Sequence, residues 1–174
     1  MGAIFQIQPK YDQLDDYVTF AKEHDMDFEV LELSMNREID FTQVQALAKT
    51  GLVKSFHGVF IDINPVSNNP VIKAASRKQI QESCELAKIL GAQNIVLHSS
   101  CFPFLRDNYM EIWAAQSAKY FDDLQRRTKL NIFIENSMDV DPDPLRALMD
   151  HCENPKVNVC LDLGHANYSR VDLD

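Results

Sequence analysis

The sequence predicts an α/β fold built on a parallel β-sheet. Short apolar segments that suit strands alternate with longer segments of helical periodicity through the 174 residues. This alternation is typical of strand–helix–strand units, whose right-handed crossovers leave the strands parallel. The last strand-like segment, residues 157–161 (VNVCL), is apolar except at Asn158, as expected of a strand buried on both faces.

Six strands and five helices are expected in order. The strands are residues 3–8, 28–33, 52–60, 94–98, 131–135 and 157–162, and the helices are residues 11–24, 42–49, 71–90, 108–128 and 143–152. Asp40 is a candidate N-cap of the second helix, and Gly51 and Gly91 are expected to end the second and third helices. Residues 62–70, rich in Asn and Pro, form a long loop of the kind that covers a site at one end of a sheet.

Two architectures fit this alternation: a doubly wound open sheet and a (β/α)8 barrel of the TIM-barrel type. The segment after the first strand, QPKYDQ, has no glycine-rich phosphate loop, which weakens the nucleotide-binding open sheet. Polar residues end many successive strands and favour the barrel, whose site is assembled from all strand ends at one face. We therefore expect a single barrel domain over residues 1–174, with about six of the eight βα units.

The missing seventh and eighth strands raise the question of how the barrel is completed. The chain is expected to be a truncated version, a proteolytic fragment, or a chain completed by another copy. Open strand edges pair with other strands, so a homo-oligomer formed through these edges is also expected.

Composition restricts the possible partners. The formal net charge of −9 is a poor match for nucleic acid or an anionic membrane. The N-terminus lacks the pattern of a signal peptide, and no apolar run approaches the length of a membrane span. Four cysteines without a C-x-x-C pair are typical of reduced thiols, so a cytoplasmic location is expected.

Five ligand-type side chains fall at or just beyond the carboxyl ends of the last four strands: His57, His98, Glu135, Asp162 and His165. In a parallel barrel these ends meet at one face. Imidazole and carboxylate groups suit Zn²⁺, Mn²⁺ or Co²⁺, and Mg²⁺ if carboxylates dominate. The alternative is structural: Asp162 caps a following helix and the histidines pack in the core.

Four motifs, HGVFIDINP, IVLHSS, FIENS and CLDLGHAN, resemble the xylose isomerase-like barrel superfamily. This group includes isomerases and epimerases of sugars and sugar phosphates, together with the endonuclease IV branch. The resemblance covers residues 56–168 well and the first two strands loosely. It implies a divalent metal ion as cofactor.

By this resemblance, Glu135 and Asp162 match the metal-binding carboxylates of strands 5 and 6. His165 matches a histidine that contacts substrate in the isomerases and metal in the nuclease branch. His57 and His98 match histidines that bind metal in the nuclease branch. The family's other ligands, a His on strand 7 and a Glu on strand 8, are not in this chain, which puts catalysis by the chain alone in doubt.

The resemblance leaves three functions open. The first is a sugar isomerase or epimerase acting through an enediolate, with Glu135 as ligand and acid/base group and His165 holding a substrate oxygen. The second is an endonuclease IV-like phosphodiesterase acting on DNA, which the acidic balance and the lack of a basic, aromatic-bearing stretch oppose. The third is a non-catalytic, truncated barrel that binds a small ligand or partner.

Three further residues are candidate contacts to a small sugar substrate: Glu32, Asn64 and Asn136. Glu32 lies near the end of the second strand, and the two asparagines could orient substrate hydroxyls or satisfy loop backbone. Neighbouring parallel strands sit about 4.8 Å apart, so the carboxyl groups of Glu135 and Asp162 are expected within about 8 Å of each other.

Overall fold

The computed structural model describes residues 5–31, 39–101, 108–137, 139 and 141–169. The strands are β1 (Phe5–Ile7), β2 (Met26–Leu31), β3 (Val53–His57), β4 (Asn94–His98), β5 (Asn131–Glu135) and β6 (Val157–Cys160). The helices are η1 (Tyr11–Gln13), α1 (Leu14–Glu23), α2 (Phe41–Thr50), α3 (Pro70–Leu90), α4 (Asn108–Thr128), α5 (Asp143–His151) and α6 (Leu163–Tyr168).

The strand order decides between the two predicted architectures. All six strands form one parallel sheet in the order β1-β2-β3-β4-β5-β6. A doubly wound sheet reverses direction at a switch point, so its strands are out of sequence order. An unbroken sequential order is that of a (β/α)8 barrel, and the predicted TIM-barrel-like fold is confirmed for the six units of this chain.

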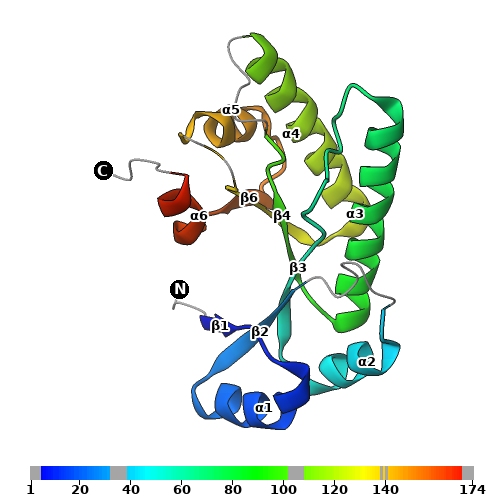
Figure 1. Ribbon diagram of the computed structural model, residues 1–174, viewed down its shortest axis with the longest axis vertical. Coiled ribbons are helices and arrows are strands. Elements are labelled where there is room, and N and C mark those ends of the chain that lie inside the picture. The colour runs from blue at the N-terminus through cyan, green and yellow to red at the C-terminus, as the bar shows by residue number, and fades with distance from the viewer. Residues whose placement is uncertain (1–4, 32–38, 102–107, 138, 140, 170–174) are drawn as a thin grey trace.

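The long helices cover one face of the curved sheet. Figure 1 shows α3 and α4 along its outer side, while β1 and β6 lie towards the opposite, open side. The pairing register aligns Phe56 with Ile95 and Ile95 with Ile132, and all three are fully buried. The main hydrophobic core therefore lies between the sheet and the outer helices.

The opposite face of the sheet carries polar side chains near the amino ends of three strands. Asn94 Nδ2 donates to Ser55 Oγ at 3.1 Å, and Asn131 Nδ2 donates to Asn94 Oδ1 at 2.9 Å. These bonds join β3, β4 and β5 side by side. We call this row of Ser55, Asn94 and Asn131 the polar ladder.

The predicted roles of Asp40, Gly51 and Gly91 at helix ends are confirmed. Asp40 caps α2 by accepting a hydrogen bond from Thr42 N at 2.8 Å. Gly51 and Gly91 follow α2 and α3 with φ values of 68° and 82°, in the left-handed region that favours glycine. α3 begins at Pro70 after Asn69, whose side chain accepts from Val71 N at 2.9 Å.

The sixth strand differs from its prediction in length and burial. β6 ends at Cys160, two residues earlier than expected, and Val159 is 42% exposed. In the described part of the chain β6 pairs with β5 alone, so it is an edge strand and is not buried on both faces. The residues that follow turn at Asp162 into α6, the helix that the alternative interpretation of Asp162 as a cap had implied.

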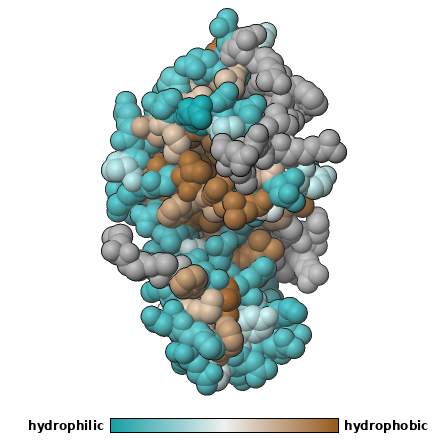
Figure 2. All heavy atoms as spheres, turned by 90° about the vertical axis from the view of Figure 1, so that its left-hand side faces the viewer, coloured by the Kyte–Doolittle hydropathy of each residue, from teal (hydrophilic) through white to brown (hydrophobic). Residues whose placement is uncertain are grey.

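Apolar side chains are exposed at both edge strands. Phe5 of β1 is exposed, as are Leu161 and Leu163 just after β6. Figure 2 shows an apolar patch in the middle of the face on the left of Figure 1, the open side of the sheet. Among the described helices, none has the length and apolar character needed to cross a membrane.

Candidate metal centre

A buried carboxylate, Glu135, lies between two imidazole rings from neighbouring strands. Its Oε2 is 2.9 Å from His57 Nε2 and 3.4 Å from His98 Nε2. Each of the three residues ends its strand, and Glu135 pairs in register with His98. The parallel sheet therefore brings these three polar side chains together at its carboxyl edge.

Two more ligand-type side chains lie on the other side of this carboxylate. His165 Nδ1 is 3.6 Å from Glu135 Oε1. Two groups of three residues each bring their ligand atoms within 4.8 Å of one another. One group is Glu135, Asp162 and His165, and the other is His57, His98 and Glu135. The expected proximity of the Glu135 and Asp162 carboxylates is thus confirmed, while their role as ligands stays a prediction.

Asp162 has a structural role as well. It is the N-cap of α6, and its Oδ1 accepts a hydrogen bond from His165 N at 2.6 Å. The helix cap and the side-chain cluster were alternatives in the sequence, and the structure contains both. The cap fixes Asp162 relative to His165, because the side chain of one is bonded to the backbone of the other in the first turn of α6.

Backbone carbonyl groups orient two of the imidazole rings. His57 Nδ1 lies 3.0 Å from Gly58 O, and His165 Nδ1 lies 2.8 Å from Asn136 O. A carbonyl oxygen only accepts, so both Nδ1 atoms carry a hydrogen, which is the usual arrangement behind a metal-binding histidine. Gly58 lies close to its neighbours, because a Cβ at this position would lie 2.8 Å from Leu97 Cδ2 and would require that side chain to shift.

The charges of Glu135 and His57 are coupled. Burial favours the neutral acid at Glu135, but the hydrogen bonds from His57 and His98 outweigh it and hold its pKa well below the usual range. Burial opposes the charged ring of His57, but hydrogen bonds to Glu135 and to Gly58 O outweigh it and raise its pKa. Each group therefore favours the charged form of the other.

This donor set fits a divalent metal ion. A metal ligand must be deprotonated, and a cation binding at His57 Nε2 and Glu135 would take the place of the shared proton. Three imidazoles and two carboxylates suit Zn²⁺, Mn²⁺ or Co²⁺. They belong to His57, His98, Glu135, Asp162 and His165. These residues could hold one ion or more.

Asn136 connects the end of β5 to the start of α6. Its Nδ2 donates to Asp162 O at 2.9 Å, and its Oδ1 accepts from Asp162 N at 2.7 Å. Both polar atoms of the side chain are thus bonded to the backbone of a proposed ligand. The predicted contact between Asn136 and substrate stays a prediction, and the structure adds a positioning role for this residue.

Asn136→Ala is expected to weaken metal binding by about 10- to 100-fold, because loss of a residue that orients a ligand has effects of this size. The matched control is Asn158→Ala, an exposed asparagine of the neighbouring strand. Metal affinity is measured by competition with a coloured chelator. Equal affinities in the two variants would refute a positioning role for Asn136.

The other predicted substrate contacts lie elsewhere. Asn64, in the loop after β3, accepts a hydrogen bond from Val66 N at 3.2 Å and lines a separate hollow with Trp113. The described contacts of its side chain do not include the residues around Glu135. Glu32 falls outside the described residues, and its predicted role stays a prediction.

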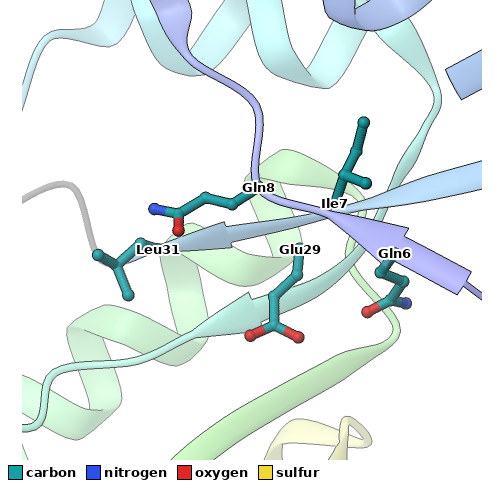
Figure 3. A pocket seen from close by; sticks show the side chains of 5 residues that line it. All are labelled: Gln6, Ile7, Gln8, Glu29 and Leu31. Carbon is teal, nitrogen blue, oxygen red and sulfur yellow. The ribbon is translucent and has the colours of Figure 1, made fainter. Parts of the chain in front are cut away.

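One acidic residue near the site was missed in the sequence. Glu29 of β2 lines a hollow of about 250 Å³ with Gln6, Gln8 and Leu31. Figure 3 shows the Glu29 and Gln6 side chains pointing to the same side of the β1–β2 pair, and Ile7 pointing to the other. Burial raises the pKa of Glu29, although His57 opposes this rise.

Period-two alternation was the signal that could have identified this residue. In the segment FEVLEL, Phe28 and Val30 are the buried residues, so Glu29 must face the opposite side of the sheet. That side carries His57, because Glu29 pairs in register with Ser55, which precedes His57 by two residues in β3. The charge of Glu29 therefore adds to the acidic balance of the site.

This chain is similar in sequence or in fold to several known proteins. The sequence model of the xylose isomerase-like TIM barrel matches residues 16–173. Probable endonuclease 4 of Mycobacterium leprae is 28% identical over an alignment of 131 residues, which covers 72% of this chain and 50% of that protein. The chain thus spans about half the length of the curated relatives it matches.

Two solved structures share the fold. The TTHB071 protein from Thermus thermophilus, solved after soaking with ZnCl2, superposes with a TM-score of 0.74 and 18% identity, covering 95% of this chain and 68% of that one. A D-tagatose 3-epimerase-like protein gives a TM-score of 0.71 and 19% identity, covering 95% and 67%. The family match extends over most of the sequence, and the chain belongs to the xylose isomerase-like TIM barrel family.

Proposed function

We propose that this chain carries most of the active site of a divalent-metal-dependent isomerase or epimerase of sugars or sugar phosphates. The observation that carries the proposal is the position of Glu135, an ionised carboxylate within 2.9 Å of His57 Nε2 and 3.4 Å of His98 Nε2. Asp162 and His165 extend the same cluster. The likeness to the fold of a D-tagatose 3-epimerase-like protein supports an epimerase.

The reaction of this class moves a proton on a carbon next to a carbonyl group. A divalent ion held by these residues would supply positive charge to polarise the carbonyl and hydroxyl oxygens. Glu135 serves as a metal ligand and, being ionised, is also placed to accept the proton from carbon. Return of the proton from Glu135 to the neighbouring carbon, with transfer of the hydroxyl proton to the former carbonyl oxygen, would give an isomer. An epimer would form if a second acid, on the opposite face of the sugar, delivered a proton to the same carbon.

His165 is assigned to the substrate. Its Nδ1 is bonded to Asn136 O at 2.8 Å, which fixes the plane of the ring. The side chain is partly exposed, whereas Glu135 is buried, so a ligand can reach the imidazole from the open side of the site. A ring in this position would hold a substrate oxygen while the proton moves.

A second candidate is an endonuclease IV-type phosphodiesterase. The specific observation in its favour is the number of imidazoles: His57, His98 and His165 all lie around one carboxylate, as expected of a site with more than one metal ion. Sequence similarity to probable endonuclease 4 of Mycobacterium leprae supports it. The net charge of −9 opposes it, because binding to DNA relies on basic residues.

Exchange of carbon-bound hydrogen tests the proposal without requiring a known product. The chain, extended by the seventh and eighth strands of the barrel and with its metal content measured, is incubated in D2O with ketopentoses and ketohexoses, and NMR follows deuterium incorporation next to the carbonyl. Metal-dependent exchange with at least one ketose is expected. Cleavage of abasic-site DNA without any exchange would favour the second candidate, and bound metal with neither activity would favour a binding protein.

A further inference from the structure

The hollow between β1 and β2 has room for a small ligand. Its volume of about 250 Å³ could hold roughly eight water molecules at about 30 Å³ each. The described residues that line it are Gln6, Ile7, Gln8, Glu29 and Leu31. Figure 3 shows the carboxylate of Glu29 and the carboxamide of Gln6 on the same side of the two strands. We call this feature the β1–β2 hollow.

The β1–β2 hollow adjoins the candidate metal centre. Leu31, which lines the hollow and ends β2, pairs in register with His57, which ends β3. Neighbouring parallel strands lie about 4.8 Å apart. A chain of six carbons is about 6 Å long, because each C–C bond is about 1.5 Å. A six-carbon sugar with one end at the metal centre is therefore long enough to place its other end in the hollow.

The half-buried Glu29 carboxylate is available to a ligand. Burial raises its pKa, the charge of His57 opposes this rise, and the charge of Glu135 adds to it. In the described part of the chain, no hydrogen bond contributes to this shift. Burial of a carboxylate without donors costs free energy, and the hydroxyl groups of a ligand would supply donors. The carboxamides of Gln6 and Gln8 can both donate to and accept from such hydroxyl groups.

The charges on the inner face of the sheet oppose a phosphorylated ligand. The described lining of the hollow has no cationic residue, and Glu29 gives it negative charge. The six described strands contain one lysine, Lys54, and no arginine. Lys54 alternates with Ser55 and therefore faces the side of the outer helices. A phosphate group in the hollow would meet a carboxylate and no counter-charge from these strands.

We propose that the β1–β2 hollow holds the hydroxyl groups at the far end of an unphosphorylated sugar, with Glu29 accepting hydrogen bonds and Gln6 both donating and accepting them. This inference rests on the proposed function, because it assigns the reacting end of the same sugar to the metal centre at Glu135. It narrows the substrate class from sugars or sugar phosphates to free sugars. Glu29 and Gln6 are thus assigned to substrate binding, and neither is one of the proposed metal ligands.

Calorimetry with matched pairs of ligands tests the charge that the hollow accepts. The extended, metal-loaded chain of the exchange experiment is titrated with D-fructose and D-tagatose, and with the 6-phosphate of each. At least one free ketose is expected to bind at least about tenfold more tightly than its 6-phosphate, because Glu29 repels the phosphate. No binding of either free ketose, or 6-phosphates that bind as tightly as the free ketoses, would overturn the inference.

Variants then locate the binding. Glu29→Gln keeps the size of the side chain but removes its charge. It is expected to weaken binding of the free ketose about tenfold and not to weaken binding of the 6-phosphate. The matched control is Glu23→Gln, the same change at the exposed last residue of α1, which should leave both affinities unchanged. Equal free-ketose affinities in Glu29→Gln and Glu23→Gln would overturn the assignment of Glu29.

Gln6→Ala provides a second variant that does not depend on the stability of Glu29→Gln. It removes the carboxamide of the lining and is expected to weaken binding of the free ketose several-fold. Circular dichroism checks that both variants fold. Undiminished affinity in a folded Gln6→Ala protein would exclude the hollow as the binding site.

Exchange of carbon-bound hydrogen separates this inference from the proposed function. The same free ketoses and their 6-phosphates are incubated with the extended chain in D2O. Exchange with the 6-phosphates alone would overturn the inference and leave the proposed function intact. Binding of a free ketose that depends on Glu29, without exchange of any ketose or 6-phosphate, would support the hollow as a sugar site and contradict the proposed function.

Discussion

Replacing Glu135 with Gln is expected to weaken divalent-metal binding by more than about 100-fold and to abolish metal-dependent exchange of carbon-bound hydrogen. Loss of a residue that merely orients a ligand lowers metal affinity by about 10- to 100-fold. Glu135 is itself a proposed ligand and contacts both His57 and His98, so its replacement should lower the affinity further. The amide keeps the volume and one acceptor oxygen but has no charge. Metal binding is measured by chelator competition, and exchange is measured by NMR.

Glu153→Gln provides the control for this variant, because the Glu153 side chain is 85% exposed and lies outside the site. It should bind metal as the unaltered chain does. Circular dichroism checks that Glu135→Gln still folds. A folded Glu135→Gln protein with undiminished metal affinity would exclude Glu135 as a ligand and would require the metal centre to be placed elsewhere.

Phe56→Ala is expected to lower the free energy of unfolding by about 3–5 kcal/mol, the usual loss for a large aromatic side chain removed from a core. Phe56 is fully buried in β3, and its register partners on either side are the buried residues Val30 and Ile95. Truncation leaves a cavity that these neighbours can fill only in part. Urea unfolding followed by circular dichroism measures the loss.

Phe41→Ala tests whether burial is responsible. Phe41 is the same residue type at the first position of α2 and is 60% exposed. Surface substitutions of this kind usually change the free energy of unfolding by less than about 0.5 kcal/mol. Similar losses in the two variants would contradict the assignment of Phe56 to the core between the sheet and the outer helices.

Most of the fold follows from sequence because the strand signals are local. The apolar segments NIVLH and NIFIE begin after clear helix ends, and β4 and β5 have the predicted bounds. The predicted end of β6 was wrong, and the reason is equally local. The segment VNVCL stays apolar through Leu161, so nothing in the sequence marks the last residue that pairs with β5. The side chain of Asn136 bonds Asp162 instead, and that contact is long-range.

The site was predictable where topology alone decides proximity. His98 and Glu135 end neighbouring parallel strands, so their meeting requires only the correct strand order. Glu29 was missed because the expected strand, residues 28–33, has a second glutamate, Glu32, nearer its predicted end, where site residues are expected. Asn64 lies in a loop, where no periodicity fixes the direction of a side chain.

The polar ladder has a consequence for how folding and metal affinity depend on each other. Side chains alternate along a strand, so a slip of one residue between β4 and β5 would turn either His98 or Glu135 towards the outer helices. Asn94 can donate to Ser55 and accept from Asn131 in the observed alignment, and a slip would break this row. A cation at the carboxyl ends and amide bonds near the amino ends therefore select the same register. Metal would thus stabilise the folded chain, and the ladder would pre-align the ligands before the metal arrives.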